Sequence, residues 1–337
     1  MNLWANHVDS MDIVAPETEK PTAIFQEYNH SNVTLYPVAS FSLTSLSEML
    51  RTLFKLPKIL YVIYSAMRRA DHIHLRCPGN MGLLGCIVQI FFPSKLKTAK
   101  YAGNWDPKSN QPTSYRLQKW ILSNTSLTKN CKVLVYGEWP NQTNNIIPFF
   151  TATYSEADKQ PTQKRDYTGK VQCLFVGSLT TGKQPLEAIK LVKEALAKGH
   201  KITLDIYGDG EQRNVLEDYI QQNSLEQVVR LHGNQASDVI QEAYRNAHFL
   251  ILPSKSEGWP KVVAEAMFWA CIPVTTKVSC VPWMLDYGNR GFLIDEAFSF
   301  HEILQQETRL EVMSSAALQW SRQYTLDKFE SDIKGLL

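Results

Sequence analysis

The chain has 337 residues, of which 44% are hydrophobic and 20% are charged. This composition is typical of globular proteins and excludes extensive disorder, and the length suits two α/β domains of roughly 150 residues each. The formal net charge of +2 gives no support for a nucleic-acid partner. The longest apolar stretch, residues 82–93, is shorter than the roughly 20 residues that span a bilayer, and no signal-peptide pattern opens the chain. We therefore expect a cytoplasmic protein, or one on the inner face of a membrane.

The six cysteines and the acidic residues show no metal-binding pattern. No two cysteines form a C-x-x-C pair, no histidine cluster completes a ligand set, and no D-x-D occurs. Reduced, buried thiols are the expected state of such cysteines. We expect neither a metal ion nor a cofactor.

Strand and helix signals alternate through the first half of the chain. Apolar runs predict strands at 12–16, 33–38, 72–76, 97–105, 131–137 and 149–156, and helical spacing predicts helices at 46–70, 80–91 and 114–124.

The second half alternates more regularly. A polar segment, residues 156–170, precedes it and is predicted to be the interdomain linker. Continuous apolar strands with crossover helices then indicate a parallel sheet covered on both faces. We predict an α/β fold with two Rossmann-like domains that face a cleft. We expect residues 1–160 to form the first domain, residues 161–322 to form the second, and residues 323–337 to form a helix that packs back on the first.

Residues 250–274 carry the most informative pattern. An apolar strand leads into a polar turn and a helix, with Pro260 expected at the first helical position, where its missing N–H costs nothing. A helix N-terminus at the end of a parallel strand suits a phosphate group. Glu257 lies just before the helix, and Glu265 lies eight positions later, about two turns on. Each carboxylate can accept sugar hydroxyls. The alternative is that both are solvated charges on an ordinary helix.

The segment EGWPKVVAEA, residues 257–266, resembles the E-x7-E signature of retaining glycosyltransferases of family 4, whose usual form is E-G-F-G-L-x-x-x-E-A. The resemblance implies the GT-B fold, a catalytic contact of Glu257 with the donor sugar, and a contact of Glu265 with the ribose. It also implies that Gly258, Trp259, Lys261 and Val262 line the donor site. The sequence departs from the signature at Pro260, which has no amide hydrogen, and at Lys261, which can supply a charge instead.

A second segment, VGSLTTGK at 176–183, resembles the family's VGR-x4-K loop, which binds the diphosphate. Lys183 keeps its place and is our second catalytic candidate, whereas Ser178 replaces the arginine. A lysine on this loop provides a point charge for phosphate, although most loop lysines only face solvent. Because the arginine is missing, a further phosphate charge must be met elsewhere, for which Lys261 is the candidate.

Two other loops of the second half carry weaker signals. Gly208, Asp209 and Gly210 follow a strand and resemble the family's G-x-G loop near the nucleotide, although a plain turn explains them equally well. His232 ends the next strand and could border the base. We include Gly208, Asp209 and His232 among the donor-binding candidates.

The acceptor-side candidates are Arg76, Asn80 and Asn104, which lie at or after predicted strand ends. His72 and His74 are expected to alternate along their strand, so that only one of them faces the cleft. The loop that contains Asn104 has no histidine where the family often places one, and no catalytic base is assigned.

The predicted helix at 46–70 is apolar but punctuated by basic residues, which are Arg51, Lys55, Lys58, Arg68 and Arg69. A packed helix with solvated lysines is the commoner explanation. The alternative is a peripheral contact with an anionic membrane surface.

The first residues, MNLWANHV, have the pattern of the end of a helix, and in a doubly wound domain such a helix follows a strand. We therefore expect that the first strand and a glycine-rich loop lie upstream of Met1, which would leave the N-terminal domain incomplete and weakly stable. A subfamily with a shortened N-terminal domain is the alternative.

These observations predict transfer of a sugar from a nucleotide donor to a hydroxyl group with retention of anomeric configuration. UDP-sugar is the first expectation for the donor and GDP-sugar the second, and the resemblance implies a saccharide or lipid-linked saccharide acceptor. Two alternatives stay open. One is a sugar-nucleotide epimerase of the same fold, and the other is a non-catalytic or truncated sugar-nucleotide-binding protein.

Overall fold

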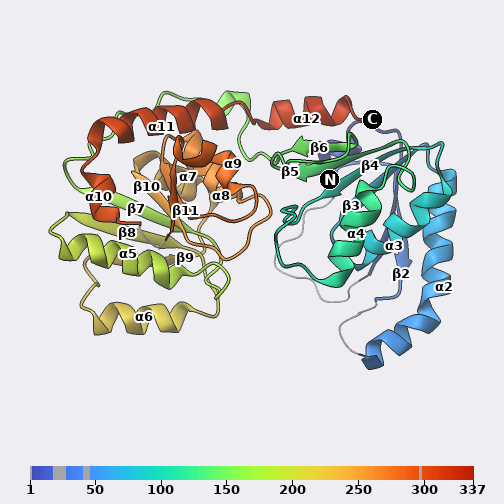
Figure 1. Ribbon diagram of the computed structural model, residues 1–337, viewed down its shortest axis with the longest axis horizontal. Coiled ribbons are helices and arrows are strands. Elements are labelled where there is room, and N and C mark those ends of the chain that lie inside the picture. Colours follow the sequence, from blue (N-terminus) through green and yellow to red (C-terminus); the bar gives the residue numbers. More distant parts are fainter. Residues whose placement is uncertain (1, 18–27, 41–45, 296–297) are drawn as a thin grey trace. The chain divides into compact units, whose positions relative to one another are not determined.

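The computed structural model describes residues 2–17, 28–40, 46–295 and 298–337, with side chains of the 46–69 helix from residue 54 onward. The chain divides into two compact units (Figure 1). Unit 1 comprises Met1–Phe149 and Phe329–Leu337, and unit 2 comprises Phe150–Lys328. The boundaries predicted from the sequence, after residues 160 and 322, lie 11 residues later and six residues earlier than these.

Unit 1 contains two parallel sheets among its described residues. A two-stranded sheet pairs β1 with β2, and a four-stranded sheet has the order β3-β4-β5-β6. The strands are β1 (Met11–Pro16), β2 (Val33–Val38), β3 (His72–Cys77), β4 (Leu96–Tyr101), β5 (Cys131–Tyr136) and β6 (Ile146–Phe149). The helices are α1 (Asn2–Ala5), α2 (Leu46–Arg69), α3 (Asn80–Val88) with the 3-10 turn η1 (Gln89–Phe91), α4 (Thr113–Ser123) and most of α12 (Leu326–Lys334).

The core of unit 1 forms because strand and helix periodicities meet. Ile73 and Leu75 point inward from β3 at a spacing of two, and Ile59, Ile63 and Met67 point inward from α2 at helical spacing. These side chains share one buried cluster. The amphipathic pattern of the two elements therefore fixes which face of each is covered.

Unit 2 contains one six-stranded parallel sheet with the order β12-β11-β10-β7-β8-β9. Its strands are β7 (Val171–Val176), β8 (Ile202–Tyr207), β9 (Val229–Gly233), β10 (Phe249–Leu252), β11 (Ile272–Thr276) and β12 (Phe292–Ile294). Its helices are η2 (Glu156–Asp158), α5 (Pro185–Ala197), α6 (Arg213–Gln222), α7 (Ser237–Asn246), α8 (Lys261–Phe268), α9 (Val281–Met284), η3 (Asp286–Gly288), α10 (Phe300–Leu304) and α11 (Glu307–Ser321).

Both faces of the unit 2 sheet are covered, as the apolar strands predict. All four residues of the central strand β10 are buried. Helix α5 lies on one face, and α7 and α8 lie on the other (Figure 1). The strand order explains this arrangement. Strands β8 and β9 are added on one side of β7, and strands β10, β11 and β12 are then added on its other side, so the connecting helices change faces.

One predicted strand is wrong. The run at 149–156 was expected to be a strand, but β6 ends at Phe149 and residues 150–155 form no strand. Its aromatic residues serve as anchors instead. Phe150 packs on Tyr324 with a ring-centroid distance of 4.9 Å, and Tyr154 packs on Phe268 at 4.7 Å. The even spacing of these large side chains therefore resembles a strand pattern, although the segment is not a strand.

The polar segment 156–170 is also more than a linker, because it lies within unit 2. The guanidinium of Arg165 donates hydrogen bonds to backbone carbonyls at the ends of α7 and α8, namely those of Tyr244, Arg245, Ala247, Trp269 and Ala270. Burial lowers the pKa of this guanidinium. A charged side chain satisfies carbonyls that the helix ends leave without partners.

Among the residues that the structure describes, no helix is long and apolar enough to cross a membrane.

Candidate active site

The strand order of unit 2 reverses between the neighbouring strands β7 and β10. The loops that leave the carboxyl ends of these two strands, residues 177–184 and 253–260, therefore open side by side. The amide of Lys255 in the second loop donates to the carbonyl of Gly182 in the first, at 2.9 Å. Open α/β sheets bind ligands at such a reversal.

Glycines hold the loops after β7, β8 and β9 together. The amide of Gly177 donates to Tyr207 O at 2.9 Å, and the amide of Gly208 donates to Gly233 O at 2.8 Å. A Cβ atom on Gly208 would lie 1.9 Å from Gly177 O, and φ of Gly208 is +135°. Only glycine fits here. The Gly208-Asp209-Gly210 segment is thus a close-packing element rather than a plain turn.

Lys183 and Glu257 form an ion pair across the two loops. Lys183 Nζ lies 2.5 Å from Glu257 Oε1, and the Glu257 side chain is only 8% exposed. The structure thus brings the two catalytic candidates together at the strand-order reversal. A cation and a carboxylate at this position can hold an anionic group and a hydroxyl group of the same ligand.

Helix α8 begins at Lys261, one residue later than predicted. Pro260 is the N-cap residue, and its ψ of 91° is extended rather than helical. Its carbonyl still accepts the amide of Val263 at 2.9 Å. The first helical amides therefore belong to Lys261 and Val262, and the positive end of the helix dipole lies at the loop that carries Glu257.

Glu265 lies just beyond the first turn of α8 and is held from both sides. Thr153 Oγ1 donates to Glu265 Oε1 at 2.6 Å, and the hydroxyl of Tyr244 donates to Oε2 at 3.2 Å. Tyr244 is fully buried, and burial, followed by the charge of Glu265, raises the pKa of its phenol well above the ordinary value. Sequence reasoning missed Thr153 and Tyr244, because no sequence signal links them to Glu265.

Gly258 and Trp259 are fixed by the interior of unit 2. The carbonyl of Gly258 accepts hydrogen bonds from Ser279 Oγ and Cys280 Sγ, each at 3.2 Å. The side chain of Trp259 is 7% exposed and packs near the rings of Trp283, Trp320 and Tyr324. This side chain anchors the loop, which leaves the backbone as the part of Trp259 that can face a donor.

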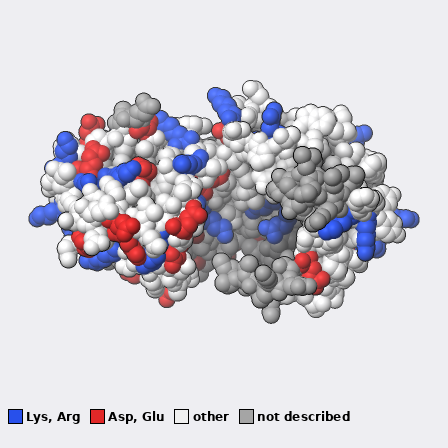
Figure 2. All heavy atoms as spheres, turned by 90° about the horizontal axis from the view of Figure 1, so that it is seen from below, with Lys and Arg blue, Asp and Glu red and all other residues white. Residues whose placement is uncertain are grey.

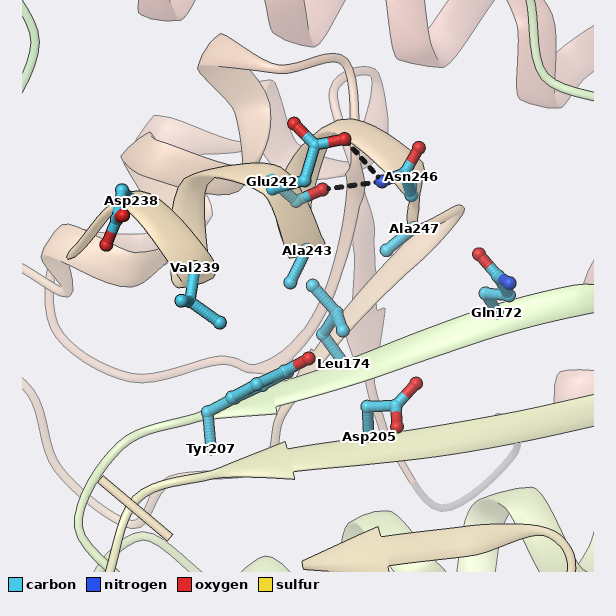
Figure 3. A pocket seen from close by; sticks show the side chains of 10 residues that line it. All are labelled: Gln172, Leu174, Asp205, Tyr207, Asp238, Val239, Glu242, Ala243, Asn246 and Ala247. Carbon is cyan, nitrogen blue, oxygen red and sulfur yellow. Dashed lines mark hydrogen bonds between the residues drawn. The ribbon is translucent and has the colours of Figure 1, made fainter. Parts of the chain in front are cut away.

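His232 lies on the edge strand β9 and forms a cluster with Asp205 and Tyr207 of the neighbouring strand β8. Its Nε2 lies 2.6 Å from Asp205 Oδ1, and its ring stacks on Tyr207 with centroids 4.6 Å apart. Tyr207 and Asp205 also line a pocket of about 500 Å³ that β7 and β8 form with α7 (Figure 3). Lys183, Glu257 and Glu265 do not line this pocket, so it is distinct from the paired loops.

Ser178 is exposed on the loop after β7, and Asp209 Oδ1 accepts the amide of Gly210 at 2.8 Å. Nearby, Arg213 opens helix α6 and lies 3.8 Å from Asp209. A Cβ atom on Gly233 would lie 3.7 Å from the guanidinium of Arg213. Sequence reasoning missed this cation, although a basic residue directly after a glycine-rich loop was the available signal.

The acceptor-side candidates belong to unit 1 and lie at the carboxyl ends of its strands. Arg76 is exposed near the end of β3, and Asn80 opens α3 three residues beyond that strand's end. Asn104 follows β4, the neighbour of β3, and its side-chain oxygen accepts the amide of Asp106 at 2.9 Å. The structure therefore gathers these three residues at the carboxyl ends of two adjacent strands.

The side chains of His72 and His74 lie on the same face of β3, contrary to the prediction. Both contact the hydroxyl of Thr98, at 2.9 and 2.8 Å. The prediction that the two histidines alternate between faces is wrong, because residues two apart in a strand share a face. The ring of His74 packs against that of Trp4 with centroids 4.1 Å apart, and burial lowers the pKa of His74 to about 3.

Comparison with known proteins shows which family unit 2 resembles. Residues 156–320 match the family model described as glycosyl transferases group 1. Unit 2 carries a glycosyltransferase group 1 domain.

Curated relatives of this domain are glycosyltransferases by name. The GtfA subunit of the UDP-N-acetylglucosamine–peptide N-acetylglucosaminyltransferase of Limosilactobacillus reuteri is 31% identical over 112 residues, which is 32% of this chain and 20% of that protein. A Salmonella typhimurium protein named as a colanic acid biosynthesis glycosyltransferase, WcaL, is 28% identical over 132 residues, which is 37% and 32% of the two chains. The chain thus spans less than half the length of these relatives.

Solved structures share the α/β fold with parallel sheets over most of the chain. Sucrose-phosphate synthase from Thermosynechococcus elongatus superposes with a TM-score of 0.64 at 16% identity, covering 96% of this chain and 87% of that one. HepE of Anabaena, solved in complex with UDP, gives a TM-score of 0.62 at 14% identity, covering 90% and 85%. The solved neighbours of this fold include GT-B glycosyltransferases, among them sucrose-phosphate synthase.

Proposed function

We propose that this chain transfers a sugar from a nucleotide donor to a hydroxyl group of a saccharide or lipid-linked saccharide, with retention of anomeric configuration as in family 4. The observation that carries the proposal is the Lys183–Glu257 pair at the reversal of strand order. Helix α8, which carries Glu265, begins at the same loop, and all three residues belong to the group 1 domain.

The transfer breaks the bond between the anomeric carbon and a diphosphate oxygen, and the acceptor oxygen forms the new bond while its proton leaves with the nucleoside diphosphate. Negative charge grows on the diphosphate as it leaves. Lys183 and the N-terminus of α8 stabilise that charge. Glu257 accepts hydrogen bonds from hydroxyls of the donor sugar, and Glu265 accepts them from the ribose.

UDP-sugar is the first donor to test and GDP-sugar the second. The Limosilactobacillus relative is named for UDP-N-acetylglucosamine, and the HepE structure contains UDP. A cytoplasmic setting at the inner face of a membrane, where lipid-linked acceptors are accessible, is part of the proposal.

The test is to incubate the full chain with a panel of UDP- and GDP-sugars and saccharide acceptors, and to follow products by mass spectrometry. Proton NMR of the product gives its anomeric configuration. A new glycoside with the donor's configuration is expected. Conversion of the donor sugar into its epimer would indicate an epimerase, and tight donor binding without any turnover would indicate a binding protein.

A further inference from the structure

Helix α2 turns large apolar side chains toward solvent. Phe54 is 88% exposed and Tyr61 is 71% exposed, whereas Ile59 and Ile63 on the other side are buried in the core of unit 1. Phe54 and Tyr61 are seven residues apart, so they lie on one face two turns apart. Exposed aromatic residues grouped in this way mark an interaction surface more often than scattered ones do.

The same face of α2 is basic. Lys55, Lys58 and Arg68 are exposed, and the sequence contains no Asp or Glu from residue 49 to residue 70. Among the described residues, none of these three cations takes part in an ion pair. On the side of unit 1 seen in Figure 2, blue Lys and Arg side chains are more frequent than red acidic ones. From residue 54 onward, the described part of α2 therefore carries exposed positive charge and no carboxylate of its own.

A neighbouring turn extends this surface. Lys95 Nζ donates to the carbonyl of Arg68 at 2.7 Å, and the ring of Phe92 lies 5.1 Å from that of Tyr64. These contacts hold the turn against the C-terminal half of α2. Its apolar residues Phe91 and Leu96 are themselves exposed. We call this surface the α2 face, formed by Phe54, Lys55, Lys58, Tyr61, Tyr64, Arg68, Phe91 and Leu96.

We propose that the α2 face docks unit 1 on an anionic lipid bilayer. Tyrosine and phenylalanine rings enter the headgroup boundary, and lysine and arginine side chains reach anionic headgroups. A second copy of the chain is disfavoured as the occupant, because two α2 faces would oppose positive charge to positive charge. The strong exposure of Phe54 and Tyr61 also goes beyond what a packed helix with solvated lysines requires. This inference does not depend on which sugar the chain transfers.

Co-sedimentation of the full chain with vesicles tests the proposal. Binding to phosphatidylcholine vesicles that contain phosphatidylglycerol should exceed binding to phosphatidylcholine alone and should fall with added salt. Lys55→Gln with Lys58→Gln should weaken binding by about fivefold per lysine. Phe54→Ser with Tyr61→Ser should weaken it by about tenfold or more per ring.

Matched variants separate docking from general effects. Lys108→Gln with Lys129→Gln, which removes two exposed lysines elsewhere on unit 1, should bind normally, as should Trp120→Ser on α4. Lys55→Arg with Lys58→Arg should keep the affinity, and circular dichroism melts should show that each variant is folded.

Equal binding to neutral and anionic vesicles would overturn the proposal, as would loss of binding in the control variants. Light scattering would overturn it in favour of self-association if it showed a dimer that Phe54→Ser with Tyr61→Ser dissociates, without any binding to vesicles.

Discussion

Lys183 Nζ and Glu257 Oε1 lie 2.5 Å apart although 74 positions separate the two residues in the chain. The sheet order brings them together, because β7 and β10 are neighbours and each residue lies on the loop that follows one of these strands. The lysine proposed for the diphosphate is thus paired with the carboxylate proposed for the sugar. A bound donor would exchange this contact for separate contacts with its own groups.

Glu257→Gln should separate the roles of the two residues. The amide no longer neutralises Lys183, so the affinity for UDP should stay unchanged or rise. Transfer should fall by about 10- to 150-fold, because a hydrogen bond to a charged group contributes about 1.5–3 kcal/mol. Calorimetry and initial rates measure the two effects, with Glu187→Gln on the surface of α5 as the control. Equal losses of UDP affinity and of transfer would mean that the role of Glu257 is misassigned.

Glu265 and Tyr244 should act together on the ribose. Glu265→Ala should weaken UDP binding by about 1.5–3 kcal/mol. Tyr244→Phe removes the hydroxyl that donates to Glu265 Oε2, so the carboxylate is less well oriented and UDP binding should weaken to a smaller extent. Both variants should lose part of the preference for UDP over 2′-deoxy-UDP, whereas Tyr219→Phe on α6 should keep it.

An unchanged preference in Glu265→Ala would place the ribose elsewhere. If Tyr244→Phe lost stability but kept the preference, its hydroxyl would have a structural role only.

Arg165→Ala should destabilise unit 2. The substitution leaves the carbonyls at the ends of α7 and α8 without their donor, and each buried unsatisfied group costs about 1–3 kcal/mol. Urea unfolding should therefore show a loss of about 3 kcal/mol or more. The neighbouring Lys164→Ala is the control, because Lys164 is 80% exposed and its ion pair with Glu311 should contribute less than about 1 kcal/mol. Similar stabilities of the two variants would contradict this account of the segment.

Transfer should survive EDTA. The sequence has no D-x-D, and no group of three His, Cys, Asp or Glu side chains within the described ranges could hold a metal ion. Charge on the leaving diphosphate must then be met by Lys183 and the start of α8. Loss of transfer in EDTA that magnesium restores would contradict this mechanism.

Most strands and helices could be predicted from the sequence, because the buried strands of unit 2 are short and continuous and its helices are amphipathic. The strand expected at 149–156 could not be separated from a run of anchors, since Phe150 and Tyr154 have strand-like spacing but pack against side chains far along the chain.

The candidate site was predictable only in part. Lys183, Glu257 and Glu265 belong to local motifs, whereas Thr153 reaches Glu265 across 112 positions. Such a contact depends on the packing of whole elements, which local patterns do not encode. The position of Arg213 beside the loops after β8 and β9 has the same origin.

The measurement that tests the central claim most directly is calorimetric titration of UDP and of uridine into the wild-type chain and Lys183→Ala. UDP should bind the wild type, and Lys183→Ala should weaken UDP binding by about 1.5–3 kcal/mol while leaving uridine binding unchanged. The difference should shrink at high salt, because part of the contact is screened charge. Lys190→Ala on the surface of α5 should bind UDP like the wild type. Normal binding of UDP by Lys183→Ala would contradict the account and place the diphosphate outside the paired loops.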